Sequence, residues 1–166
     1  MRKYILTLIV ICSVFCTANA QKIGHFSYKA LLNGMPAYIT AQQELERMRK
    51  AYTEELQVGE REFSEKYELF IEQQSTLAPA ISEKRRSELQ ELYNSNIKFR
   101  DESQRMLKQK EQDSMTPIKE SIKRAVNTVG QQGGYLLIVN TDSDACPYLD
   151  GAATYDVTAE ILSMLR

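Results

Sequence analysis

The sequence predicts an α+β fold: a long antiparallel α-helical hairpin, a coiled-coil-like arm, on a small β body that oligomerises through a shared barrel. Two long amphipathic stretches flank a short reversal, β-rich runs lie near both ends of the mature chain, and those end segments are too small to form a core alone. We assign residues 1–20 to a signal peptide, 37–129 to the hairpin arm with its tip near 78–82, and 21–36 and 130–166 to the β-rich oligomerisation body.

The first twenty residues have the organisation of a secretory signal. Arg2 and Lys3 form a basic start, residues 5–16 form an apolar run too short to span a bilayer as a helix, and Ala18-Asn19-Ala20 has the small residues of a cleavage site. Cleavage after Ala20 leaves 146 residues with a net charge of −3 and one cysteine, Cys146. We therefore expect an extracytoplasmic chain without an internal disulfide.

The mature chain begins with a predicted strand and turn. Residues 22–28 alternate between two faces, which predicts a short strand, and Asn33-Gly34 predicts a turn after it. Pro36 suits the first turn of a helix because its missing N–H needs no partner there, and residues 37–77 contain no further Pro. These residues are predicted to form the first long helix.

One apolar face of this helix has spacings of three and four residues, which repeat after eleven residues. Such a repeat corresponds to about 3.67 residues per turn and predicts a nearly straight seam. Aromatic side chains and a glycine stand where a stable zipper carries Leu and Ile, so we expect loose packing. The seam consists of Leu45, Met48, Tyr52, Leu56, Gly59, Phe63, Tyr67 and Phe70.

A second long helix is predicted from Glu83 to Val129. Pro79 disfavours helix at the residue before it, and Ser82 is suited to cap the new helix. We interpret Pro117, like Gly59 in the first helix, as a hinge or kink.

The two helices have opposite net charges, −4 over residues 44–72 and +4 over residues 84–124. These charges favour antiparallel pairing, although each exposed ion pair contributes only about 0–1 kcal/mol.

The C-terminal segment returns to strand-forming sequence. Gly133-Gly134 predicts the end of the second helix, and residues 135–139 are apolar on both faces, which predicts a buried strand. Residues 148–155 are predicted to add a weak strand, and Asp156 to cap a short final helix.

Residues 21–36 and 131–166, outside the hairpin, number 52, and two or three strands of this size are marginal in isolation. We therefore expect several protomers to share one closed sheet, which removes exposed strand edges. The residues assigned to this contact are Ile23, Phe26, Tyr135, Leu136, Leu137, Ile138 and Val139.

The composition argues against an enzyme, a metal protein and a nucleic-acid-binding protein. The single His cannot supply a zinc cluster, and neither a phosphate-binding Gly-rich motif nor a basic stripe is present. Asp142-Ser143-Asp144 begins like a calcium loop, but Cys146 and Pro147 stand where that loop needs a ligand and a glycine. A Cys146/His25 pair is a minor alternative, and we predict no catalytic residue, metal or cofactor.

Several motifs together are similar to one family. They are the signal peptide, Ile-Gly-x-Phe-x-Tyr at 23–28, Met-Pro-Ala-Tyr at 35–38, two helices about a short reversal, Gly-Gly-Tyr-Leu-Leu-Ile-Val-Asn at 133–140, and Asp-Val-Thr-Ala-Glu-Ile-Leu at 156–162. In this order they resemble the Skp/OmpH family over essentially the whole mature chain.

The resemblance implies a periplasmic, ATP-independent holdase chaperone. Members of the family are homotrimers whose three helical arms enclose unfolded outer-membrane proteins and deliver them toward the outer membrane. The best-known members are strongly basic, whereas this mature chain is slightly acidic, so binding of lipid or lipopolysaccharide stays open. Lys84, Arg85 and Arg86 are the nearest candidates for an anionic contact.

A holdase gains about 25 cal/mol for each Å² of apolar client surface that it covers, and many weak contacts release a client more readily than one deep pocket. The same side chains at helical spacing also serve packing between the helices. The alternative is a structural or adaptor coiled-coil protein of the cell envelope that binds one folded partner. The predicted client-binding residues are Tyr52, Phe63, Tyr67, Phe70, Leu77, Tyr93, Phe99 and Met106.

Overall fold

The computed structural model describes residues 22–166, which are mostly helical and include a small sheet. The α+β class predicted from the sequence is therefore confirmed, whereas the shared barrel stays a prediction. The predicted signal peptide lies outside the described residues. In chain order the elements are β1 (Lys22–Phe26), α2 (Tyr28–Gly34), α3 (Pro36–Gln73), α4 (Pro79–Gly133), β2 (Tyr135–Asn140), β3 (Tyr155–Asp156) and α5 (Thr158–Ser163).

The chain divides into two compact units, which are described separately below. The body unit contains the residues up to Leu31 together with Arg124–Met164. The hairpin unit contains Leu32–Lys123 and the last two residues.

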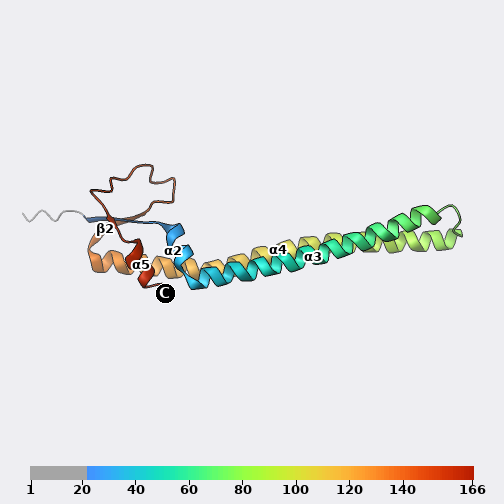
Figure 1. The fold of residues 1–166 in the computed structure, drawn as a ribbon, viewed down its shortest axis with the longest axis horizontal. Helices are drawn as coiled ribbons and strands as arrows, with labels where there is room; N and C mark the ends of the chain where they lie inside the picture. The colour runs from blue at the N-terminus through green and yellow to red at the C-terminus, as the bar shows by residue number, and fades with distance from the viewer. Residues whose placement is uncertain (1–21) are drawn as a thin grey trace, which may run out of the picture. The chain divides into compact units, whose positions relative to one another are not determined.

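In the hairpin unit, α3 and α4 run side by side in opposite directions (Figure 1). Contacts between them keep one antiparallel register, because partners that lie later in α3 lie earlier in α4. The contacts run from Glu44–Lys110 through Tyr52–Phe99, Gly59–Asn96 and Phe63–Tyr93 to Gln73–Arg85.

The two helices meet the connecting turn at positions that differ from the prediction. Helix α3 ends at Gln73, where the carbonyl accepts hydrogen bonds from the Thr76 N–H at 2.9 Å and the Thr76 hydroxyl at 2.8 Å. Helix α4 begins at Pro79, so the prediction that Ser82 caps it is wrong. Pro79 opens the helix because the first helical position needs no N–H donor, and the Ser82 N–H bonds to the Ala78 carbonyl at 3.0 Å.

The seam of the hairpin unit buries a few apolar side chains and one polar one. Leu45, Phe70, Leu89 and Ile118 are buried. Ser103 is 4% exposed, and its hydroxyl has no hydrogen-bond partner. Burying an unsatisfied hydroxyl costs free energy, so Ser103 weakens the pairing of the helices.

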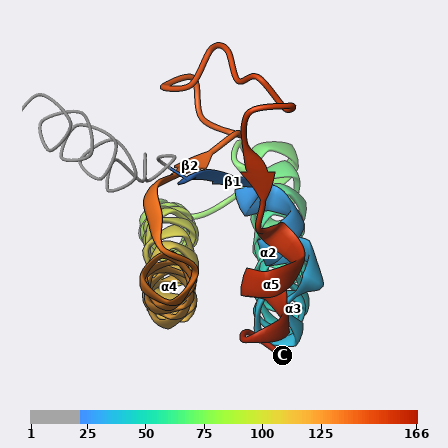
Figure 2. The same cartoon turned by 90° about the vertical axis from the view of Figure 1, so that its left-hand side faces the viewer.

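The body unit contains a three-stranded sheet in the order β2-β1-β3, with both pairs parallel (Figure 2). Ile23 is in register with Leu137, and His25 with Val139 on one side and Asp156 on the other. Strands β2 and β3 therefore each have one edge that pairs with no described strand. The buried apolar side chains of this unit are Phe26, Leu31, Ala125, Val129, Val157 and Ile161.

Two predictions for the start of the body are corrected. The strand predicted over 22–28 ends at Phe26, and the turn predicted at Asn33-Gly34 belongs to α2. Helix α2 forms where a turn was expected because side chains far away in the sequence accept hydrogen bonds from the backbone N–H groups at its start. Asp142 Oδ2 accepts hydrogen bonds from the Lys29 N–H at 2.6 Å and the Ser27 hydroxyl at 2.9 Å, and the Ser27 N–H donates to the Thr158 hydroxyl at 3.1 Å.

The C-terminal part of the body brings two further corrections. Strand β2 was predicted to be buried, but Leu136 is 65% and Leu137 54% exposed, because β2 is an edge strand and nothing in the described chain covers these side chains. The N-cap position of α5 is Val157, not Asp156. Asp156 still supports the helix start, since its carboxylate accepts the Thr158 N–H at 2.8 Å. Hydrogen bonding to the Thr158 side chain, and then to its N–H, lowers the pKa of Asp156.

Asp142 is expected to make the stability of α2 depend on pH. The hydrogen bond from Lys29 N–H, with that from Ser27, lowers the pKa of Asp142 from its ordinary value of 3.8. The stabilisation is present above that value and is lost as the pH falls through the lowered pKa. At neutral pH, Asp142→Ala should therefore increase hydrogen exchange in residues 28–34, and as the pH falls through the lowered pKa of Asp142 the variant and the parent protein should become similar.

The control for this experiment is Asp144→Ala in the same exposed loop. Asp144 is exposed and has no hydrogen bond in the structure, so its removal should leave exchange in α2 unchanged. Equal exchange in Asp142→Ala and the parent at neutral pH would contradict the assigned role.

Ser103→Ala is expected to stabilise the hairpin, since it removes a buried hydroxyl without a partner. The gain should be about 1 kcal/mol beyond the effect of helix propensity. Ser95→Ala is the matched control, because Ser95 is exposed on the same helix and undergoes the same chemical change. Urea unfolding followed by circular dichroism measures both, and equal gains in the two variants would show that the Ser103 hydroxyl costs nothing.

Candidate functional site

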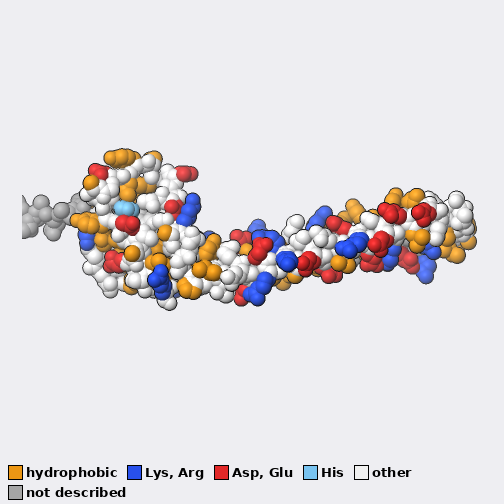
Figure 3. All heavy atoms as spheres, in the orientation of Figure 1, with side chains coloured by type: hydrophobic (Ala, Val, Ile, Leu, Met, Phe, Trp, Pro, Cys, Tyr) orange, Lys and Arg blue, Asp and Glu red, His pale blue; other side chains and the backbone are white. Residues whose placement is uncertain are grey.

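The hairpin unit exposes large apolar side chains along its whole length. Hydrophobic surface alternates with basic and acidic side chains on the visible face of the hairpin (Figure 3). The exposed fractions of the apolar residues range from 45% to 52%. These residues are Ile39, Val58, Tyr67, Leu69, Ile71, Ile81, Tyr93 and Met106.

The residues that the sequence singled out for client contact differ in their exposure. Tyr67, Tyr93 and Met106 are exposed, and Phe70 is buried. The other four, Tyr52, Phe63, Leu77 and Phe99, are half-buried.

Aromatic pairs connect the two helices. Tyr52 and Phe99 meet edge to face with ring centroids 6.0 Å apart, and the Phe63 ring lies 5.8 Å from that of Tyr93. Tyr67 stacks on Phe63 within α3 at 5.9 Å. Tyr67 and Tyr93 therefore take part in packing and still present about half of their surface to solvent.

The predicted client-binding residues omit five exposed apolar residues, which are Ile81 in α4 and Ile39, Val58, Leu69 and Ile71 in α3. The seam pattern selects side chains that face the other helix, whereas the four in α3 lie off the seam. Large apolar side chains at positions where the helical pattern expects polar ones are the signal that identifies them.

The Asn96 side chain of α4 lies directly against the α3 backbone at Gly59. The Asn96 side-chain amide donates a hydrogen bond to the Gly59 carbonyl at 2.9 Å. A Cβ atom on residue 59 would lie 2.5 Å from Asn96 Oδ1, which is closer than packed atoms tolerate. Gly59 therefore allows α4 to place a polar side chain directly against α3.

Most ion pairs of the hairpin lie within one helix, such as Glu62–Lys66 at 2.6 Å and Glu46–Arg49 at 2.8 Å. Lys110 and Glu44 connect the two helices at 2.8 Å, and this contact lowers the pKa of Glu44. At Glu44 and Lys110 the opposite charges of the two helices thus meet across the seam, as predicted. Elsewhere in the hairpin the ion pairs form between residues of the same helix.

The three candidate cations all contact groups of their own hairpin. Lys84 pairs with Glu88 at 3.7 Å and Arg86 with Glu83 at 3.4 Å. The Arg85 guanidinium donates to the neutral Gln73 side-chain oxygen at 2.7 Å.

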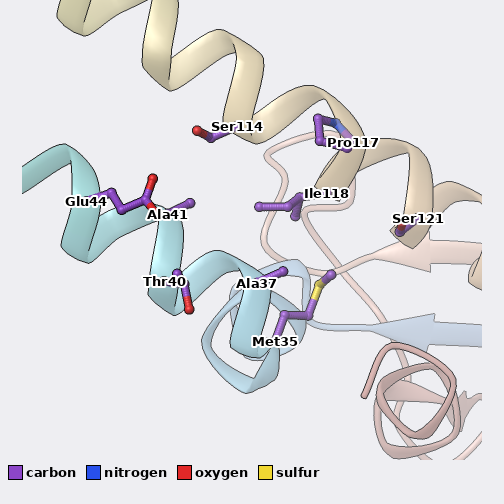
Figure 4. A pocket seen from close by; sticks show the side chains of 9 residues that line it. All are labelled: Met35, Ala37, Thr40, Ala41, Glu44, Ser114, Pro117, Ile118 and Ser121. Carbon is purple, nitrogen blue, oxygen red and sulfur yellow. The ribbon is translucent and has the colours of Figure 1, made fainter.

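A shallow groove of about 300 Å³ lies beside Pro117 (Figure 4). Small side chains of α3 and α4 face each other across it, among them Ala37 and Ala41 opposite Ser114. Helix α4 continues through Pro117, and the hinge or kink predicted there stays a prediction.

The predicted oligomerisation residues occupy the sheet of the body unit. Phe26 is buried, Ile23, Tyr135, Ile138 and Val139 are half-buried, and Leu136 and Leu137 are exposed. The Lys22 ammonium lies over the Tyr135 ring at 4.3 Å and the Tyr155 ring at 5.1 Å.

The structure places the His25 and Cys146 side chains and tests the described residues for a metal cluster. Within residues 22–166, no cluster of three His, Cys, Asp or Glu side chains could hold a metal ion. His25 Nδ1 is buried without a partner, and the Cys146 thiol contacts the Tyr148 carbonyl at 3.5 Å, so the two side chains form no nucleophile–base hydrogen bond. None of the helices in this part of the chain combines the length and hydropathy of a membrane span.

Comparisons with known proteins agree on one family. The model of the family described as outer membrane protein (OmpH-like) matches residues 22–165. The crystal structure of an OmpH-like outer membrane chaperone from Caulobacter crescentus is similar, with a TM-score of 0.73 and 14% identity over 87% of this chain and 83% of that one. No curated protein sequence matches this chain.

Gly59→Ala is expected to destabilise the hairpin despite the better helix propensity of alanine. The new Cβ must displace Asn96 and break its hydrogen bond, a loss of about 1–2 kcal/mol against a gain of about 1 kcal/mol. Gly130→Ala is the matched control, because its Cβ would make ordinary contact at 3.5 Å and the gain in propensity remains. Unfolding in urea measures both, and stabilisation by Gly59→Ala equal to that of the control would contradict the packing role of Gly59.

Proposed function

This chain belongs to the OmpH-like family of outer membrane proteins, and from that premise we propose that it is an ATP-independent periplasmic holdase chaperone. It binds unfolded outer-membrane β-barrel proteins between its helical arms, prevents their aggregation and aids their delivery to the outer membrane. The signal peptide is removed after Ala20, and residues 37–129 form the arm.

The observation that carries this proposal is the distributed apolar surface of the hairpin unit. Exposed aromatic, aliphatic and thioether side chains recur from Ile39 to Met106, and charged residues separate them. Each contact with a client contributes little, because only part of a side chain leaves water, while many contacts together retain an unfolded chain. The intervening charges keep the empty arm in solution.

We further propose that the body is the site of oligomerisation, with residues 21–36 and 130–166 contributing to a shared barrel. Two observations support a second copy as the partner. Strands β2 and β3 each have an edge without a described partner, and Leu136 and Leu137 expose more than half of their surface on β2. A trimer is the assembly that the family resemblance implies.

We propose no lipid contact at the basic cluster. Two of its three cations, Lys84 and Arg86, are paired with glutamates, which leaves little net charge to attract an anionic surface.

The first test is suppression of aggregation of a denatured outer-membrane porin. We expect the mature protein to suppress light scattering without nucleotide at a near equimolar ratio of trimer to porin. Absence of suppression at a several-fold excess, together with capture of a single folded partner, would support the adaptor alternative instead.

The second test removes exposed apolar side chains that make no inter-helix ring contact. The triple variant Val58→Ser, Ile71→Ser and Met106→Ser should raise the concentration for half-maximal suppression about tenfold, since it removes three partial client contacts. The matched control replaces exposed Gln42, Gln57 and Gln104 by Ser. Circular dichroism establishes that helicity is retained, and equal activity of the two triple variants would contradict the role of the apolar surface.

A further inference from the structure

A second groove, of about 240 Å³, lies between the last turns of α3 and the first turns of α4. Its apolar lining consists of Phe70 and Leu89, which are 6% and 9% exposed, and Leu69, which is 45% exposed. The groove therefore has a buried apolar floor and an accessible apolar rim. We call it the tip groove.

Three charged side chains line the tip groove, and two of them are neutralised. Lys66 pairs with Glu62 at 2.6 Å, and Glu88 pairs with Lys84 at 3.7 Å. Among the described residues, Arg85 forms no ion pair. Arg85 is half-buried as a residue, and its guanidinium donates to the neutral Gln73 side chain at 2.7 Å.

The half-buried Arg85 has no anionic partner among the described residues, so its positive charge is not balanced by a nearby negative one. Arginine has five N–H donors in a planar fork, and one donor bonded to an amide leaves others for a further acceptor. A carboxylate fits the fork with two parallel hydrogen bonds. The nearby apolar floor reduces the access of water, so such a bond is stronger there than on an open surface.

We propose that the tip groove binds unfolded segments in which an acidic side chain lies next to a large apolar one. The apolar side chain packs against the exposed Leu69, above the floor of Phe70 and Leu89, and the carboxylate bonds to Arg85. This inference rests on the proposed holdase function and names the class of client segment that one part of the arm selects.

Charge complementarity favours this occupant over a phosphate-bearing lipid. A phosphate group carries more negative charge and needs several uncompensated cations, whereas the groove offers one. An internal segment is favoured over a chain terminus because an unfolded client presents many internal segments and only one C-terminus.

The test uses two labelled peptides with blocked ends, acetyl-Gly-Phe-Glu-Phe-Gly-amide and the same peptide with Gln in place of Glu. Fluorescence anisotropy with the full-length mature protein should give roughly fivefold tighter binding of the Glu peptide. Arg85→Gln should abolish this preference, and Arg85→Lys should keep part of it, because lysine retains the charge without the fork.

Arg86→Gln is the matched control, since Arg86 is the adjacent basic residue, is exposed and already pairs with Glu83. It should keep the full preference. Equal loss of preference in Arg86→Gln would overturn the proposal in favour of general attraction. Equal binding of both peptides by the parent protein would also overturn it.

Two further experiments distinguish the proposed occupant from a chain terminus and from a lipid. The Gln peptide with a free C-terminal carboxylate should bind like its amide, and tighter binding that depends on Arg85 would assign the groove to chain ends. Phosphatidylglycerol vesicles should not displace the Glu peptide, and displacement that depends on Arg85 would assign it to lipid.

Failure of this proposal is distinguishable from failure of the holdase function. Suppression of porin aggregation by the parent protein tests the holdase function, whereas the peptide preference of the same protein tests the tip groove. Suppression of aggregation without any preference between the peptides overturns the tip groove alone.

Discussion

The close approach of α3 and α4 at Gly59 is the constraint on which the hairpin unit depends. The Asn96–Gly59 hydrogen bond sets the register, and the aromatic contacts of Tyr52 and Phe63 continue it on either side. A pair of helices has only one seam, so apolar side chains that point elsewhere cannot be buried within the protomer. A long hairpin therefore carries apolar surface distributed along its whole length and not gathered into one deep cleft.

Sequence periodicity was sufficient to predict the two long helices, since their spacing is a local property. It was insufficient at their ends, where Pro79 acts as the first residue of α4 and not as a breaker before it. Helix α2 was missed because Asp142 and Thr158, more than a hundred residues away, satisfy its first donors. The apolar side chains of β2 predict burial against another surface, but the pattern does not identify which surface buries them.

The candidate surface was also predicted only in part, for a related reason. Spacing of three and four identifies the side chains that face the partner helix, such as Phe70, and these are the ones that packing removes from solvent. Val58 and Leu69 lie outside that spacing and stay exposed. The net charges predicted attraction between the helices. However, acidic residues one turn away in the same helix compete for the same basic side chains. Which cation is paired therefore depends on the geometry, and Arg85 contacts the neutral Gln73.

Both units leave apolar surface uncovered, but they do so in different patterns. In the body, Leu136 and Leu137 are adjacent on a strand of defined geometry beside an unpaired edge, so a partner must present a matching edge, as another copy of the same chain does. In the hairpin unit, single apolar side chains are separated by charges, so no partner of fixed shape can cover them all. An unfolded chain can adjust to such spacing because its own conformation is free. The contrast between a continuous and a dispersed apolar pattern is thus the physical basis for assigning assembly to one unit and client binding to the other.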